Sequence, residues 1–154
     1  MLIRVSVLYA GATALVLSLS AGAMWAEAVV LVDFWRAVEP AAFLEWYAAH
    51  NAGLVAFYSP LQITATALAV GLPIVLRYAT GRWFVSAISA AVLAVGVIAL
   101  FFVFFKSANA EFLSADPTLA ARIPELLQTW GAWQWFRTAL GAAAAACALA
   151  ALRG

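Results

Sequence analysis

Charged side chains are scarce in this sequence, which has 8 Lys and Arg residues and 7 Asp and Glu residues among 154. A net charge of +1 provides no basic surface for nucleic acid, so we expect no nucleic-acid partner. Cysteine is limited to Cys147, which excludes an intrachain disulfide and a Cys-x-x-Cys redox site. His50 is the lone histidine, and the carboxylates are scattered. Because this pattern matches no usual metal-ligand spacing, we expect neither a metal nor another cofactor.

Apolar residues make up 68% of the chain, and the mean hydropathy is +1.02, far from the values of soluble domains. About 20 apolar residues cross a hydrocarbon core of roughly 30 Å. Runs of this kind predict helices at approximately residues 5–32, 52–76, 83–106 and 132–152. The first continues to Val32, so we expect a helix there and not a cleaved signal peptide. The sequence therefore predicts one all-α domain over residues 1–154, an integral membrane four-helix bundle.

The distribution of basic residues predicts the orientation of this bundle. With four spans, both termini and the loop between the second and third helices share one side. That side holds Arg4, Arg77, Arg82 and Arg153, and all seven acidic residues belong to the other side. Because short cytoplasmic loops are rich in Lys and Arg, we expect both termini on the cytoplasmic face of a bacterial inner membrane.

Two further segments, residues 39–51 and 116–130, are expected to form short interfacial helices that cover the outer side. In the first, Pro40 suits the first position of a helix. The apolar spacing of an amphipathic helix follows in Phe43, Trp46, Tyr47, His50 and Leu54. In the second, Asp116-Pro117 has the pattern of an N-cap followed by proline.

Polar side chains near membrane depth are costly and often mark a functional site. Helical counting brings a group of them to one level near the outer side: Glu27, His50, Asn51, Asn109, Gln134 and Arg137. We expect Glu27 or Glu111 to form an ion pair with Arg137, because an unpaired guanidinium inside the span would be expensive. His50 is either a hydrogen-bonded core residue or a proton acceptor, since imidazole titrates near neutral pH.

Two stretches of the sequence are similar to a known family. They are Asn109-Ala-Glu-Phe-Leu and Trp130-Gly-Ala-Trp-Gln-Trp-Phe-Arg-Thr-Ala-Leu, and His50-Asn51 before a helix with Pro60 fits more loosely. Together they resemble the anthrone-oxygenase-like proteins, which are small four-helix membrane proteins. Where that family often has His or Asn three residues before the arginine, this chain has Gln134, which cannot accept a proton.

The resemblance implies a cofactor-independent oxygenase that acts on a lipophilic, anthrone-like aromatic substrate. It implies His50 as the base, with Arg137 and Asn109 stabilising the oxyanion. The residues expected to bind the substrate are Glu27, Asn51, Trp130, Trp133 and Gln134, the tryptophans by stacking on its rings.

Two other classes of function fit the same sequence. The chain could be an accessory or assembly subunit, packed in a homo-oligomer or a larger membrane complex through small-residue ridges. These ridges are Ala10, Ala14, Ser18, Gly22 and Ala26, and Ala139, Ala143, Cys147 and Ala151. Alternatively, it could bind a lipophilic small molecule such as a quinone. Polar groups that converge on a cavity would favour the enzyme or the binding protein, and polar groups tied to each other or to a partner would favour the subunit.

The orientation can be tested by cysteine labelling. A cysteine placed at Thr80 in a Cys147→Ala background should react with a membrane-impermeant maleimide only after the inner membrane is opened, because the Arg77–Arg82 loop is expected to be cytoplasmic. Labelling of this position in intact spheroplasts would contradict the predicted orientation.

Overall fold

The computed structural model describes residues 1–114 and 118–153, and all the regular structure in these two ranges is helical. The elements in chain order are α1 (Leu2–Ala26), the π-helix η1 (Glu27–Leu31), α2 (Val32–Ala37), α3 (Pro40–Thr80), α4 (Val85–Leu100), the π-helix η2 (Phe101–Phe105), α5 (Lys106–Phe112), the 3₁₀ helix η3 (Leu119–Arg122) and α6 (Ile123–Ala151). The predicted all-α class is confirmed.

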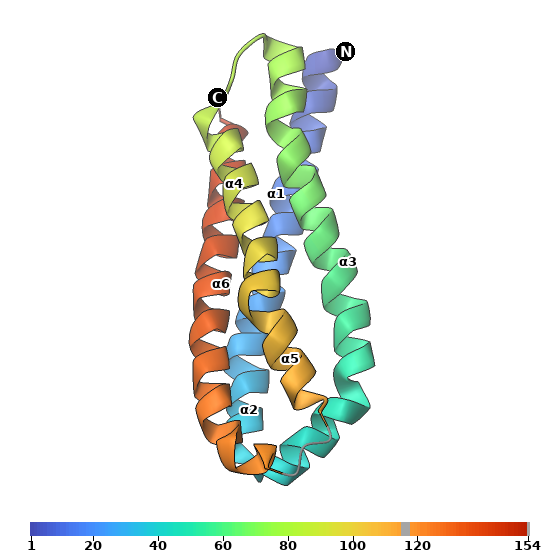
Figure 1. The fold of residues 1–154 in the computed structure, drawn as a ribbon. Coiled ribbons are helices and arrows are strands. Elements are labelled where there is room, and N and C mark those ends of the chain that lie inside the picture. Colours follow the sequence, from blue (N-terminus) through green and yellow to red (C-terminus); the bar gives the residue numbers. More distant parts are fainter. Residues whose placement is uncertain (115–117, 154) are drawn as a thin grey trace.

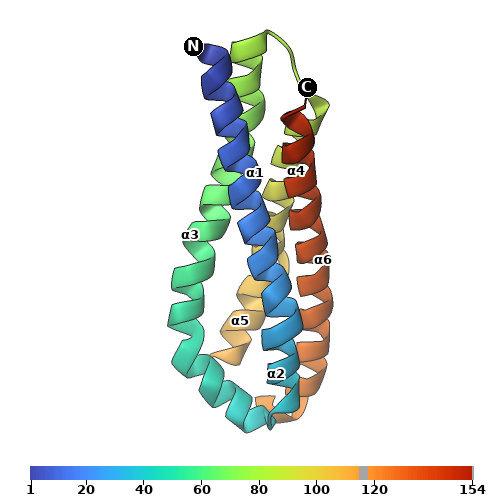
Figure 2. The ribbon, with the colours of Figure 1, turned by 180° about the vertical axis from the view of Figure 1, so that it is seen from behind.

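The elements form four long rods, because α1, η1 and α2 are continuous, and so are α4, η2 and α5 (Figure 1). Neighbouring rods run antiparallel, and α1 and α4 each pack against both α3 and α6. Both termini and the turn between α3 and α4 lie at one end of the bundle (Figures 1 and 2). Gly81 ends α3 there with φ of 74°, a left-handed conformation that favours glycine. We call the opposite end the far end.

Three of the four rods are long and apolar enough to cross a membrane. Within the described part of the chain these are Leu2–Ala37, Pro40–Thr80 and Val85–Phe112. The fourth rod, α6, does not belong to this group. Gln134 and Arg137 lower its hydropathy, although both side chains are buried inside the bundle.

The expected outer segments are not separate from the long helices. Residues 40–51 are the first turns of α3, which bend across the far end of the bundle (Figure 2). Residues 123–130 likewise begin α6. The helix that begins at Pro40 continues past residues 51 and 52 as one element to Thr80. The expected N-cap at Asp116-Pro117 lies outside the described residues.

The core has two halves of different composition. Toward the termini it consists largely of alanines, including Ala14, Ala69, Ala90 and Ala144. Small side chains allow close helix approach there, and Met24 of α1 packs directly onto Gly141 of α6. At the far end the core is mostly aromatic and aliphatic, with Trp35, Phe43, Tyr47, Phe105, Phe112 and Trp130 among its members.

The two predicted small-residue ridges are only partly buried. Ser18, Gly22 and Ala26 of α1 and Ala139 and Ala143 of α6 are exposed. A row with an interval of four residues rotates around a helix that has 3.6 residues per turn, so it stays on the packed face for only two or three members. The glycines and alanines that α6 buries are Gly131, Gly141, Ala144, Ala145, Ala148 and Ala151.

Candidate functional site

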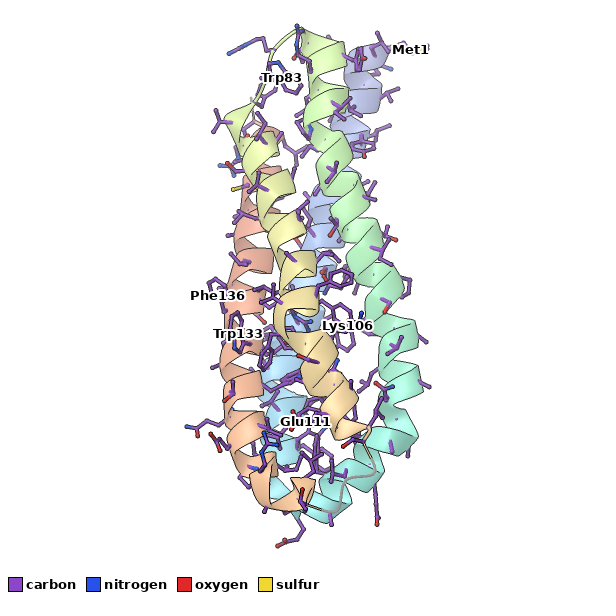
Figure 3. The ribbon with its side chains drawn as sticks, in the orientation of Figure 1. Met1, Trp83, Lys106, Glu111, Trp133 and Phe136 are labelled. Carbon is purple, nitrogen blue, oxygen red and sulfur yellow. The ribbon has the colours of Figure 1, made fainter. Side chains whose placement is uncertain are left out.

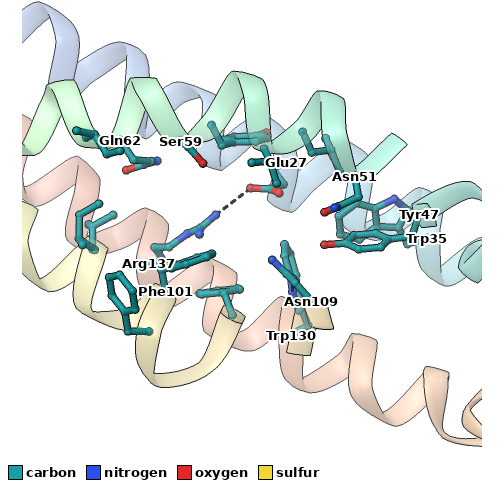
Figure 4. A pocket seen from close by; sticks show the side chains of 18 residues that line it. Glu27, Trp35, Tyr47, Asn51, Ser59, Gln62, Phe101, Asn109, Trp130 and Arg137 are labelled. Carbon is teal, nitrogen blue, oxygen red and sulfur yellow. Dashed lines mark hydrogen bonds and ion pairs between the residues drawn. The ribbon is translucent and has the colours of Figure 1, made fainter. Parts of the chain in front are cut away.

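A cavity of about 210 Å³ lies within the far half of the bundle. All four rods contribute to its lining, with Glu27 from η1, Tyr47 from α3, Phe105 from η2 and Arg137 from α6. Figure 4 shows the polar side chains of this lining facing a common space. The predicted convergence of polar groups therefore has a physical counterpart in the fold.

A buried ion pair forms part of the cavity wall. Arg137 Nη2 donates to Glu27 Oε2 across 3.0 Å, and the two residues are 8% and 5% exposed (Figure 4). Gln134 Nε2 donates to the same carboxylate oxygen at 2.8 Å and to the Met24 carbonyl oxygen at 3.0 Å. These bonds connect α1 and η1 to α6. The predicted pairing of Glu27 with Arg137 is confirmed.

The alternative carboxylate, Glu111, has a different partner. Its Oε1 lies 3.1 Å from Nη1 of Arg122, and both side chains are partly exposed. Exposed pairs of this kind contribute little to stability, about 0–1 kcal/mol. Glu111 and Arg122 therefore form an exposed pair at the far end, separate from the cavity.

Aromatic rings cover much of the remaining wall. The guanidinium Cζ of Arg137 lies 4.3 Å from the ring centroid of Phe105, a cation–π contact. Phe105 meets Trp130 edge to face at 5.1 Å, and Trp130 meets Trp35 at 5.2 Å. Tyr47 continues this series, 5.9 Å from Trp35. The wall thus combines flat apolar surfaces with one buried charge pair.

Two asparagines add amide groups to this wall. Asn109 accepts a hydrogen bond at Oδ1 from Trp130 Nε1 at 3.1 Å, which fixes the orientation of its amide. Asn51 lines the cavity from α3, facing Asn109 across it in Figure 4. Both were expected at the site, and the structure brings them together with Glu27 and Arg137.

The rim of the cavity is apolar and exposed. Val55 and Ile63 of α3 stand on one side, and Phe101 and Phe102 of η2 on the other. All four side chains are exposed on the flank of the bundle and not at its end. In a membrane this rim would face lipid chains.

Both π-helical segments contribute to the cavity. Glu27 begins η1, and η2 supplies Phe101, Phe102 and Phe105. A π-helical turn holds an extra residue, so it rotates the residues that follow relative to a regular α-helix. Such turns are frequent at functional sites, and here they meet the same cavity from two rods.

His50 does not belong to the cavity lining, and this corrects the expectation that it faces the other polar groups. It is exposed, its ring stacks on Trp46 at 4.3 Å, and its Nδ1 lies 2.7 Å from the Trp46 carbonyl oxygen. The inward face of α3 follows Tyr47, Asn51 and Tyr58 instead. His50 precedes Asn51 by one residue, about 100° away around the helix, so it points outside.

Two residues that were expected to bind the substrate, Trp133 and Gln134, also lie outside the cavity lining. Trp133 does not line the cavity: it stacks on Phe104 at 5.2 Å and lies at the side of α6 in Figure 3. Gln134 is fully buried behind Glu27 and holds that carboxylate from the protein side. Trp130, in contrast, lines the cavity as expected.

Several cavity residues were not anticipated from the sequence. They include Trp35, Tyr47, Tyr58, Gln62 and Phe105. A signal for part of this set is present, because Tyr47, Asn51, Tyr58 and Gln62 recur at intervals of four or seven residues along one helical face. The run of four phenylalanines around Val103 carries no comparable signal, since every position in it is apolar.

Among residues 1–114 and 118–153, no group of three His, Cys, Asp or Glu side chains is close enough to hold a metal ion. No protein-family model, curated protein or solved structure matches this chain significantly. The resemblance to the anthrone-oxygenase-like proteins therefore stays a prediction.

The importance of the buried pair can be measured with a matched exposed pair. Arg137→Gln leaves the Glu27 carboxylate buried without its cation, and it should lower the free energy of unfolding by about 3–5 kcal/mol. Arg122→Gln, which breaks the exposed pair with Glu111, should cost about 0–1 kcal/mol. Reversible unfolding by SDS in detergent micelles, followed by circular dichroism, measures both. Equal losses in the two variants would contradict the structural role of the buried pair.

Proposed function

We propose that this chain is an integral membrane protein of the bacterial inner membrane, with four spans and cytoplasmic termini. Large apolar side chains cover its flanks, among them Leu8, Leu19, Ile63, Phe102 and Phe136. Exposed apolar surface of this extent is costly in water and is favourable in a bilayer. The basic residues Arg4, Arg77, Arg82 and Arg153 support the orientation, because the structure gathers their segments at one end.

The function that the geometry supports best is binding of a lipophilic aromatic molecule in the cavity. The observation that carries this proposal is an aromatic wall, made by Trp35, Tyr47, Phe105 and Trp130, interrupted by the buried pair of Glu27 with Arg137. Ligand sites typically combine an apolar lining with a few polar groups that fix orientation. An engineered cavity of about 150 Å³ holds a benzene ring, so this one suits a fused ring system.

The apolar rim indicates that such a ligand comes from the lipid phase. A charged metabolite would have to pass Val55, Ile63 and Phe102, and leave its hydration shell in the membrane. A lipophilic molecule dissolved in the bilayer meets no such barrier. Glu27 and Arg137 pair with each other, but they do so on the wall of a cavity that Asn51 and Asn109 also line, and this convergence favours binding over an accessory subunit.

Filling the rim tests the proposal. Val55→Trp places an indole at the cavity mouth, so it should weaken binding of two- and three-ring aromatic compounds, from naphthalene to anthrone, by about tenfold or more, which is roughly 1.4 kcal/mol. Ala56→Trp adds the same ring to an exposed neighbour outside the lining, and it should bind as the unmodified protein does. Calorimetric titration in nanodiscs, with empty nanodiscs as the blank, measures the affinities. Unchanged binding in Val55→Trp would place the ligand elsewhere.

A second candidate function is the cofactor-independent oxygenase implied by the family resemblance. It is favoured by the position of Glu27, a carboxylate on the cavity wall beside the Arg137 cation. The described hydrogen bonds to this carboxylate use Oε2, so Oε1 is the oxygen available to a substrate. We therefore assign the role of base to Glu27 and not to the exposed His50.

The reaction balances with dioxygen as the oxidant. Glu27 removes a proton from the acidic C–H between two aromatic rings, and Arg137 and Asn109 stabilise the resulting oxyanion. The carbanion gives electrons to dioxygen, and a carbon–oxygen bond forms as a hydroperoxide. Loss of the remaining hydrogen on that carbon, with cleavage of the O–O bond, gives a carbonyl and water. One anthrone and one dioxygen thus yield one anthraquinone and one water.

This assignment predicts that one substitution lowers turnover and that another leaves it unchanged. Glu27→Gln should lower anthrone turnover by roughly 10²–10⁴-fold, because it removes the base. His50→Gln should keep turnover close to that of the unmodified protein, because its ring lies outside the cavity. Dioxygen uptake and anthraquinone formation measure turnover, and circular dichroism reports folding of each variant. Loss of turnover only in His50→Gln would overturn the assignment.

A further inference from the structure

Four buried side-chain atoms have no hydrogen-bond partner in the described part of the chain. Three of them belong to lining residues: Trp35 Nε1, Gln62 Nε2 and Arg137 Nε. Native structures leave few buried polar atoms unpaired, so each one requires an explanation. Gln134 Oε1 is the fourth such atom, and its residue does not line the cavity.

The three cavity atoms share one chemical character, because all of them are hydrogen-bond donors. The indole of Trp35 and the guanidinium of Arg137 have no acceptor atom, so their character does not depend on how an amide is oriented. Asn109 adds to this character. Its Oδ1 accepts from Trp130, and its amide NH₂ is left for the cavity.

The charged acceptor of the site is partly used. Glu27 Oε2 receives hydrogen bonds from both Gln134 and Arg137, and Oε1 is left for a ligand. The unpartnered atoms of Trp35 and Gln62 are donors, so the unmet demand toward the two ends of the cavity is for acceptor atoms. A carbonyl oxygen would satisfy these N–H groups directly, whereas a hydroxyl oxygen that accepts from them brings a hydrogen that needs an acceptor of its own.

The donors are also spread along the cavity. Gln62 and Trp35 lie toward opposite ends of the lining, and Arg137 lies between them (Figure 4). This arrangement suits a flat molecule with an acceptor oxygen at each end. Trp35 is 1% exposed and Gln62 9%, so neither donor is supplied by bulk water.

We propose that the cavity selects lipophilic aromatic diones, and that it binds the dione form of a ring system more tightly than the corresponding diol or the unsubstituted hydrocarbon. Trp35 and Gln62 are the residues that determine this specificity. The inference rests on the proposed binding function and adds the chemical class of the ligand. It concerns binding and holds whether or not the ligand is transformed.

The test compares three ligands with the same two-ring skeleton: 1,4-naphthoquinone, 1,4-naphthalenediol kept reduced under anaerobic dithionite, and naphthalene. The full chain in nanodiscs should bind the quinone most tightly. Trp35→Phe keeps an aromatic ring but removes the N–H group, so it should weaken quinone binding roughly fivefold. Gln62→Leu should have a similar effect from the other end of the cavity. Affinity for naphthalene should stay unchanged in both variants.

The control is Trp83→Phe, a tryptophan at the end of the bundle that holds the termini, which should leave all three affinities unchanged (Figure 3). Equal binding of the three ligands, reduced by Val55→Trp, would overturn the dione preference and keep the binding function. Equal losses for quinone and naphthalene in Trp35→Phe and Gln62→Leu would reduce these residues to a packing role and overturn the inference. Failure of all three ligands to bind would overturn the binding function itself.

Discussion

The pair formed by Glu27 and Arg137 is the constraint on which the far half of this bundle depends. Both groups are taken out of water, so the attraction between them must offset the desolvation of two charges. That balance holds only while η1 and α6 keep the two side chains within hydrogen-bond distance and Gln134 supports the carboxylate. Phe105 covers the guanidinium from a third rod. The position of three rods is thus tied to one electrostatic contact.

The change in core composition explains why the cavity lies where it does. Alanines such as Ala69 and Ala90 allow the rods to approach closely toward the termini, so little space is left between them. Toward the far end, large rings replace the alanines, and α3 lies further from the rod of α1 and α2 than it does near the termini (Figures 1 and 2). Rings such as Trp35 and Phe105 do not fill this wider space completely, and the remaining volume is the cavity. The polar side chains of the cavity are larger than alanine, so the closely packed alanine half could not bury them without separating the helices.

The proposed functions follow from different parts of the same wall. Binding depends on the flat aromatic surfaces and the exposed apolar rim, oxygenation on the carboxylate beside a fixed cation, and dione selection on the unpaired donors of Trp35 and Gln62. These features are physically compatible, since an oxygen of the ligand can accept from Arg137 while a ring contacts Trp130. Dione selection rests on binding, but each feature of the wall can be altered by its own substitution, which makes the three proposals separable in experiment.

The sequence by itself determined the all-α class and the four rods, because apolar length acts locally along the chain. The cost of a buried charge restricted the partner of Arg137 to Glu27 or Glu111. Only the tertiary structure decided between these two carboxylates and decided which polar residues face the cavity. One residue of helical rotation separates Asn51 inside from His50 outside, and the amphipathic pattern is too broad to resolve that difference. The positions of Trp35 and Phe105 in the cavity wall could not be predicted from the sequence either, because aromatic residues in an apolar helix form no pattern that distinguishes one face from another. Their roles follow from the packing of rods far apart in sequence.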